Sequence, residues 1–227
     1  MTRTQLYEGS SGPDDAVADV PDGATVLIGG FGMAGMPVEL IDALIRQGAT
    51  DLTVVSNNAG NGDTGLAALL AEGRVRKMVC SFPRQHDSWV FDGLYREGRI
   101  ELELVPQGNL AERIRAAGAG IGAFFCPTAV GTPLAEGKET REIDGRTYVL
   151  EYPIHGDLAL VGAHRADRMG NLVYRKTARN FGPVMATAAT TVVAQVGAVV
   201  EVGELDPEAV VTPSIYVDRV VAVGERR

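Results

Sequence analysis

The chain has 227 residues, which is enough for one large domain with a substantial buried core, and we expect residues 1–227 to form a single domain. Its 21 basic and 29 acidic side chains give a formal net charge of −8, which argues against a nucleic-acid partner. The two cysteines, the lack of an apolar leader and the absence of a long apolar run predict a cytoplasmic protein without a disulfide framework or a membrane segment.

The first half of the chain alternates strand patterns with helix patterns. Strands are predicted at 24–28, 51–56, 75–81 and 100–105, and helices at 38–45, 66–70, 89–95 and 110–117. This alternation predicts an α/β fold with an open, mostly parallel sheet and flanking helices. Ligands bind such sheets beyond the C-terminal ends of the strands. The segments that this rule selects for ligand contact are 29–35, 57–58, 82–84 and 106–108.

Residues 118–145 interrupt the alternation. A Gly-, Pro- and Thr-rich stretch leads into the charged segment 136–145, which predicts either a long functional loop or a hairpin that leaves the main sheet. We expect Lys138 and Arg141 on a solvated face of this segment. The second half is richer in strand, with strands predicted at 148–151, 158–163, 172–174, 192–196 and 215–221 and a helix at 183–189.

A glycine-rich turn, Gly30-x-Gly32-x-x-Gly35, follows the first predicted strand. The same spacing occurs in NAD-linked oxidoreductases, but these need an acidic side chain at the end of the second strand to hold the ribose hydroxyls. Here Asn57 and Asn58 follow that strand instead. This departure argues against a nicotinamide site. Glycines that only permit a tight turn from strand to helix are a further alternative.

A longer stretch, from Asp22-Gly-Ala-Thr-Val-Leu-Ile to Gly-Gly-Phe-Gly-Met-Ala-Gly-Met-Pro37, resembles the signature of the A subunits of family I CoA-transferases. The resemblance extends over nearly the whole chain, through 56–60, 105–115, 119–121, 170–175 and 178–181. It implies the family I fold and the transfer of CoA between carboxylic acids, by way of a mixed anhydride and then a glutamyl-CoA thioester.

The resemblance also implies a partner chain. In this family the nucleophilic glutamate belongs to a Ser-Glu-Asn-Gly motif of the B subunit, and that motif does not occur in this sequence. We therefore expect an enzyme that is active only with a B subunit, in an AB or A2B2 assembly. A non-enzymatic alternative is a sensing module that binds a CoA ester or a small acid without any partner.

Three segments are most similar to the family members that act on 3-oxoadipate: 80–85, 100–109 and 136–145. The implied reaction moves CoA from succinyl-CoA to 3-oxoadipate in the β-ketoadipate route of aromatic breakdown. Members that act on acetoacetate share the glycine-rich turn, the paired asparagines and the Pro-Gln-Gly sequence. Acetoacetate is therefore the alternative acceptor.

Four polar side chains that follow predicted strands are candidates for substrate contacts. Gln107 could donate to an oxyanion or cap the next helix, and the resemblance places it beside the catalytic glutamate. Asn57 and Asn58 could bind a substrate carboxylate or keto oxygen, or could make a turn; the resemblance favours the site for at least one of them. Arg84 could hold the distal carboxylate of a diacid or be an ordinary surface arginine.

The glycine-rich turn is the candidate CoA-binding segment, because glycines let the backbone approach a ligand and the helix beginning near Pro37 would direct N–H groups toward it. The residues assigned to CoA are Gly29, Gly30, Phe31, Gly32, Met33, Ala34 and Gly35. CoA esters are expected as substrates, with no tightly bound cofactor.

Neither a metal site nor a nucleophile is expected within this chain. The three histidines are scattered along the sequence, and Cys80 and Cys126 lack a metal-ligand spacing. Ser56 has no recognisable triad partner, and Cys126 has no nearby histidine to activate it.

Overall fold

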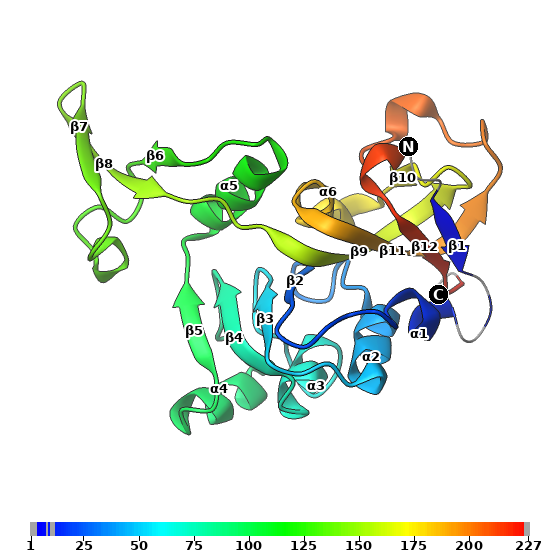
Figure 1. Cartoon of the computed structure of the whole chain (residues 1–227), viewed down its shortest axis with the longest axis horizontal. Coiled ribbons are helices and arrows are strands. Elements are labelled where there is room, and N and C mark those ends of the chain that lie inside the picture. Colours follow the sequence, from blue (N-terminus) through cyan, green and yellow to red (C-terminus); the bar gives the residue numbers. More distant parts are fainter. Residues whose placement is uncertain (1–3, 8, 10–11, 225–227) are drawn as a thin grey trace.

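A computed structural model describes residues 4–7, 9 and 12–224 of the chain. The expectation of no apolar leader rests in part on residues 1–3, which lie outside the described residues. The described residues form a large, mostly parallel sheet covered by helices, and a small antiparallel sheet that projects to one side (Figure 1).

The large sheet has nine strands. Its order is β1 (Gln5–Tyr7), β12 (Arg219–Ala222), β11 (Ala189–Val200), β9 (Gly156–Asp167), β2 (Thr25–Ile28), β3 (Leu52–Val55), β4 (Val75–Cys80) and β5 (Glu101–Leu104). All neighbours along this path are parallel, and only β10 (Leu172–Val173) pairs antiparallel, with β9. The predicted open parallel sheet is thus confirmed.

Helices cover both faces of the large sheet. The helices α1 (Gly12–Ala16), α2 (Val38–Gln47), α3 (Leu66–Ala71) and α4 (Trp89–Arg96) lie on one side, and α5 (Gln107–Gly118) and α6 (Gly182–Ala186) lie on the other (Figure 1). The alternation of side chains along β2 shows why both faces need cover. Val26 and Ile28 join the core under α1 to α4, whereas Leu27 joins the core under α5 and α6.

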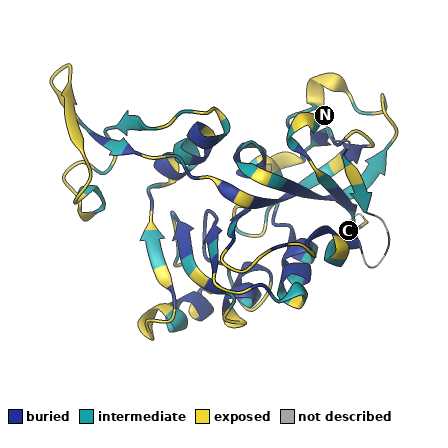
Figure 2. Ribbon diagram, viewed as in Figure 1, coloured by how far each residue is buried: buried dark blue, intermediate teal, exposed yellow. Residues whose placement is uncertain are grey.

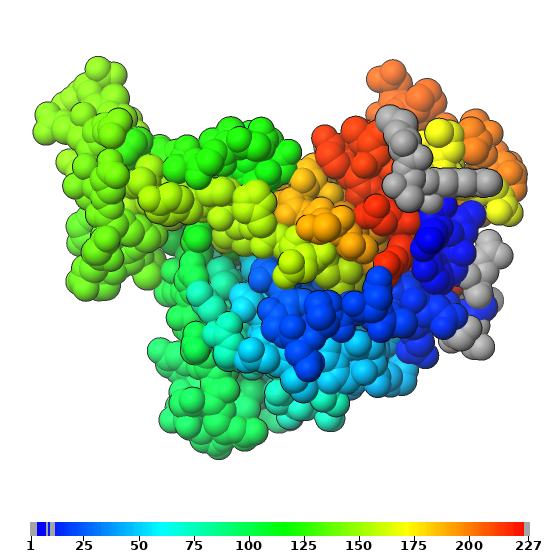
Figure 3. Space-filling model, in the orientation of Figure 1, coloured from blue at the N-terminus to red at the C-terminus, as the bar shows by residue number. Residues whose placement is uncertain are grey.

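The segment 118–145 belongs to a hairpin that leaves the main sheet, one of the two alternatives predicted for it. Strands β7 (Thr140–Ile143) and β8 (Arg146–Glu151) form the hairpin, and β6 (Phe124–Cys126) pairs with β8. This small sheet, together with the 3₁₀ turn η1 (Pro133–Ala135), forms an arm that extends from the body of the molecule (Figure 3). The outer strand β7 is exposed along its whole length (Figure 2).

Several predicted elements differ from those in the structure. The segment 215–221 was expected to be one strand, but Ser214–Tyr216 forms the 3₁₀ turn η4 and β12 begins only at Arg219. The helix expected at 183–189 ends at Ala186, because Ala189 already pairs with Gly156 in the sheet. The short elements β1 and α1 were not predicted. Two further 3₁₀ turns are η2 (Lys176–Arg179) and η3 (Pro207–Ala209). In the described part of the chain no helix is long and apolar enough to cross a membrane.

Candidate active site

The centre of the candidate site is a hydrogen-bonded group of three side chains at the C-terminal edge of the large sheet. Asn57 follows β3, Ser81 follows β4, and Gln107 begins α5 after β5. The Gln107 Nε2 donates to Asn57 Oδ1 at 2.8 Å, and the Ser81 Oγ donates to the same oxygen at 2.8 Å. Three neighbouring parallel strands therefore bring together residues that are far apart in the sequence.

The orientation of the Asn57 amide follows from these bonds. Its Oδ1 accepts from both Ser81 and Gln107, so its Nδ2 is the end that remains for another partner. Asn57 is only 1% exposed, whereas Gln107 is exposed. A pocket of about 650 Å³ opens beside this pair, lined by Phe31, Asn57, Ser81, Phe82, Arg84, Gln85, His86 and Gln107. These lining residues offer amides, a hydroxyl, an imidazole and a guanidinium, but no carboxylate.

Asn58 differs from its neighbour and does not line this pocket. Its Oδ1 accepts a hydrogen bond of 2.9 Å from the Gly60 backbone N–H, which is the turn geometry predicted as its alternative role. Its Nδ2 is buried and has no hydrogen-bond partner among the described residues. Of the two asparagines, only Asn57 reaches the pocket.

Arg84 lines the same pocket, but its guanidinium is already oriented by two neighbours. Its Nε lies 2.7 Å from Asp92 Oδ1, and its Cζ lies 5.9 Å from the centre of the Tyr95 ring. Its side chain is 55% exposed. The Asp92 contact uses one edge of the guanidinium, which has five N–H donors, so other donors remain for an anion in the pocket.

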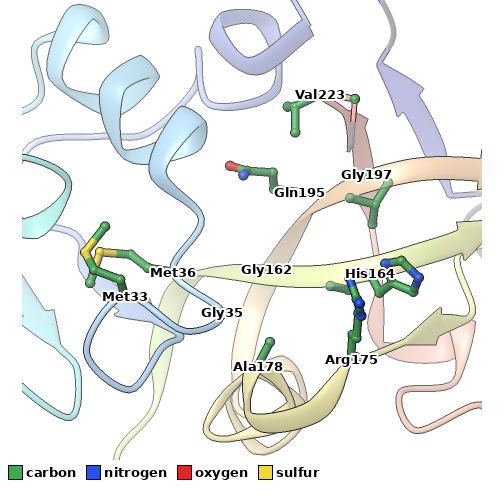
Figure 4. A pocket seen from close by; sticks show the side chains of 13 residues that line it. Met33, Gly35, Met36, Gly162, His164, Arg175, Ala178, Gln195, Gly197 and Val223 are labelled. Atoms are coloured by element: carbon green, nitrogen blue, oxygen red, sulfur yellow. The ribbon is translucent and has the colours of Figure 1, made fainter. Parts of the chain in front are cut away.

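The glycine-rich turn lies between this pocket and a second hollow. The Phe31 N–H donates to the Ala34 carbonyl at 3.0 Å, and the Ala34 N–H donates back to the Phe31 carbonyl at 3.2 Å, which closes a narrow turn. Gly35 has a φ of +76°, and a Cβ there would lie 2.6 Å from the Ala178 carbonyl oxygen, so only glycine fits. Phe31 lines the first pocket, and Met33 lines the second hollow (Figure 4).

The beginning of α2 is less available to a ligand than expected. The Leu40 backbone N–H donates to Gln195 Oε1 at 3.2 Å, and the Gln195 amide donates in turn to the Glu39 carboxylate. At least this N–H of the helix terminus is therefore used within the protein.

The two thiols and the Ser56 hydroxyl, which were considered as nucleophiles, are not among the residues that line the pocket. Burial raises the pKa of the Cys80 thiol to about 12, so the thiolate does not form near neutral pH. The Cys126 Sγ contacts Asn109 Oδ1 at 3.3 Å rather than a histidine. The Ser56 Oγ is buried without a hydrogen-bond partner in the described part of the chain. Among the described residues, no group of three or more His, Cys, Asp or Glu side chains is arranged to hold a metal ion.

An ionic network fixes the helix that carries Gln107. Glu151, on the arm, is 2% exposed and accepts from Lys138 Nζ at 2.8 Å and from Asn109 Nδ2 at 3.1 Å. Arg113 donates to Glu103 at 2.9 Å, which ties the same helix to the edge strand β5. Lys138 is exposed, as the solvated face predicted for it requires, and its Nζ also neutralises the buried Glu151 carboxylate.

Sequence reasoning missed Ser81, Gln85 and His86 as pocket residues. Ser81 was assigned to the end of a strand, although the strand-end rule that selected its neighbours applies to it as well. The His86 Nδ1 lies 2.5 Å from the Asp87 carboxylate at the exposed rim, and no pattern in the sequence distinguished this histidine.

The sequence and the fold match known proteins. The family model for coenzyme A transferase matches residues 12–223, and the chain belongs to this family. It is 71% identical to a Pseudomonas putida protein named as the A subunit of 3-oxoadipate CoA-transferase, over 92% of this chain and 90% of that protein. It is 51% identical to a Bacillus subtilis protein named as the probable A subunit of succinyl-CoA:3-ketoacid coenzyme A transferase, over 93% and 88% of the two chains.

A solved structure extends the comparison to three dimensions. The crystal structure of an acyl-CoA transferase from Escherichia coli O157:H7 superposes with a TM-score of 0.83 at 25% identity and covers 97% of this chain. The match spans 47% of that protein, so the present chain corresponds to about half its length. Family membership favours CoA transfer over the NAD-linked alternative for the glycine-rich turn.

Proposed function

We propose that this chain is the A subunit of a CoA-transferase that moves CoA from succinyl-CoA to 3-oxoadipate. The observation that carries the proposal is the Gln107 and Asn57 amide pair beside a pocket whose lining contains no carboxylate. A glutamate on a B subunit supplies the nucleophile, and the two chains form an AB or A2B2 assembly in the cytoplasm. CoA esters are substrates of this assembly, which needs no tightly bound cofactor.

The proposed reaction proceeds through attacks on carbonyl groups, and each attack develops negative charge on the carbonyl oxygen. The partner's glutamate attacks the thioester carbonyl of succinyl-CoA, the CoA thiolate leaves, and a mixed anhydride forms. The thiolate then attacks the glutamyl carbonyl and releases succinate. The glutamyl-CoA thioester passes CoA to 3-oxoadipate through the reverse sequence. Each attack places negative charge on a carbonyl oxygen, and fixed N–H donors stabilise that charge more than they stabilise the ground state.

Gln107 and Asn57 are suited to this role because they are neutral. Ser81 and Gln107 hold the Asn57 Oδ1, so the Asn57 Nδ2 is presented as a donor without reorganisation during the reaction. An amide neither competes with the glutamate for protons nor acts as an acid. In this proposal Asn57 and Gln107 stabilise the oxyanion or orient the glutamate, and Asn58 supports the turn behind them.

The acceptor is assigned by similarity and by Arg84. The Pseudomonas putida relative at 71% identity is named for 3-oxoadipate, and the Bacillus subtilis relative at 51% for a 3-ketoacid. A six-carbon oxo diacid has a second carboxylate, which Arg84 can bind with the donors that Asp92 does not use. The Gly29 to Gly35 turn contacts CoA.

The test is a CoA-transfer assay of this chain alone, of the isolated B subunit and of their mixture, with succinyl-CoA as donor. We expect activity only in the mixture, and a higher kcat/KM for 3-oxoadipate than for acetoacetate. A preference for acetoacetate would support the proposed mechanism and contradict only the proposed acceptor. Activity of this chain alone would contradict the shared site, and binding of a CoA ester by the isolated chain without any transfer in the mixture would support the sensing module.

A further inference from the structure

The second hollow shares the glycine-rich turn with the Gln107 pocket and has a different character. It has a volume of about 320 Å³. In Figure 4, Met33 and Met36 lie on one side of it, and His164 and Arg175 lie on the other. Gln195 adds a buried amide to the lining. The hollow therefore combines an apolar side with a side that carries a cation and an imidazole.

The cationic side chains beside this hollow differ from most others in the chain because they form no ion pair within the part of the chain that the structure describes. Acidic residues outnumber basic ones by 29 to 21, and most described Lys and Arg side chains form an ion pair. Three cations of one short segment, Arg175, Lys176 and Arg179, form neither an ion pair nor a side-chain hydrogen bond with any described residue. In a chain with surplus carboxylates, three neighbouring unpaired cations indicate a site for an external anion.

This cationic segment is fixed against the glycine-rich turn. The Asn180 Nδ2 donates to the Ala34 carbonyl of the turn at 2.9 Å and to the Thr177 carbonyl at 2.6 Å. Lys176 has a φ of +51°, a left-handed conformation that a lysine adopts only when its surroundings hold it. The tight packing of Gly35 on Ala178 adds a further constraint. The backbone that carries the three cations is therefore fixed before any ligand binds, which lowers the entropic cost of binding.

We propose that Arg175, Lys176 and Arg179 bind the phosphates of a CoA ester, the diphosphate and the 3′-phosphate, while its thioester lies in the Gln107 pocket. This inference rests on the proposed function. Guanidinium groups match phosphate oxygens with paired donors, and several phosphates in one ligand suit several cations in one segment. A short diacid, by contrast, has only one carboxylate besides the one that reacts, and so has fewer negative groups for these cations to bind.

The turn between the two sites is open enough for the pantetheine arm to cross it. Gly32, at the tip of the turn, has a φ of +59°, and a Cβ added there would meet no other atom within 4 Å. The backbone at this point is therefore accessible from outside. Phe31 and Met33, on either side of Gly32, are about half-exposed and offer apolar contacts to a passing chain.

The test uses the complete complex of this chain with its B subunit, carrying the double substitution Arg175→Gln and Arg179→Gln. We expect the KM for succinyl-CoA to rise on the order of tenfold or more, because two charge-assisted contacts to phosphate are lost. This rise should exceed any change in the KM for 3-oxoadipate. The wild-type preference for succinyl-CoA over its 3′-dephospho analogue should shrink in the variant.

Arg146→Gln is the matched control, because Arg146 lies on the arm and its guanidinium forms no ion pair or hydrogen bond with any described residue. It should leave both KM values unchanged. Calorimetric titration of free CoA into the wild-type and double-variant complexes measures the same contact without catalysis, and we expect weaker binding by the variant in the same proportion.

An unchanged KM for succinyl-CoA with unchanged CoA binding would overturn this inference. A rise in the KM for 3-oxoadipate instead would assign the cations to the acid, and failure of the double variant to assemble with the B subunit in gel filtration would assign them to the subunit interface. Either result also overturns it. Absence of CoA transfer by the wild-type complex would contradict the proposed function itself, and the calorimetric comparison would still decide the phosphate site.

Discussion

The Gln107 Nε2 lies 2.8 Å from Asn57 Oδ1, although the two residues belong to different strand-to-helix connections. The two amides meet because β3, β4 and β5 are adjacent and parallel, so that the segments after them emerge at one edge. Ser81, from the connection between these two, donates to the same oxygen and completes the group. The pair is thus a product of the topology, and it can act as a single unit.

Replacing Gln107 tests the oxyanion role directly. Gln107→Ala in the complex should lower kcat on the order of 10² to 10³, because a fixed donor to the developing charge is lost. Gln85→Ala is the control, since Gln85 lines the same pocket but its Oε1 is held by Asn61. Its effect on kcat should be much smaller. Equal losses in the two variants, measured by steady-state kinetics, would argue against a specific role for Gln107.

Ser81→Ala removes one of the two donors that orient the Asn57 amide. We expect a smaller loss, about fivefold in kcat, corresponding to roughly 1 kcal/mol for one neutral hydrogen bond. The double variant with Gln107→Ala should lose less than the sum of the two free-energy changes, because both residues act through Asn57. Strictly additive changes in the activation free energy would show that the three side chains do not form one unit.

The proximity of Asn57 and Gln107 could be anticipated from the sequence, because the strand-end rule depends only on recognising alternating strands and helices. The division of labour between Asn57 and Asn58 could not. Adjacent residues at a strand end direct their side chains differently, so that Asn57 faces the pocket and Asn58 stabilises the turn. The local sequence does not specify which of the two faces the pocket. The strand boundary near Arg219 was likewise set by pairing with β11, which is distant in the sequence.

The arm offers a comparison between an ion pair whose carboxylate is buried and one whose two side chains are exposed. Lys138→Ala should lower the free energy of unfolding by about 1 to 3 kcal/mol, because Glu151 is buried and would lose a charged donor. Arg141→Ala, on the same arm, breaks an exposed pair with Glu139 and a contact with the Phe125 ring, and should cost less than about 1.5 kcal/mol. Urea unfolding measures both. A larger loss for Arg141→Ala would contradict this assignment.

The ion pair between Lys138 and Glu151 could not be predicted from the sequence, because it depends on the fold of the arm. The segment 136–145 is rich in charged residues, and all of it is exposed, Lys138 included. Lys138 differs from them only because β8 brings Glu151 underneath it, and that pairing is a tertiary feature.

Asp19 and Arg219 predict a pH-dependent contribution to stability. Hydrogen bonds from Arg219 hold the pKa of Asp19 below its usual value of 3.8. A carboxyl group with a lowered pKa stabilises the folded state at pH values above the unfolded pKa, and this contribution is lost as the pH falls through the folded pKa. Asp19→Asn should therefore lower stability at pH 7, by less than about 1 kcal/mol because Asp19 is largely exposed.

Thermal unfolding at pH 7 and at successively lower pH would show this difference shrinking once the pH falls below 3.8. Asp63→Asn serves as the control, because Asp63 forms no ion pair or side-chain hydrogen bond with any described residue. A stability difference for Asp19→Asn that persists unchanged in acid would exclude the Arg219 interaction as its cause.

The division of the active site between two chains is the central claim, and trapping the covalent intermediate tests it most directly. The complex would be incubated with succinyl-CoA, the glutamyl-CoA thioester reduced with borohydride, and each chain examined by peptide mass spectrometry. We predict a reduced glutamate on the partner chain and no modified carboxylate on this one, because the lining of the Gln107 pocket contains none. A reduced Asp or Glu on this chain would contradict the account.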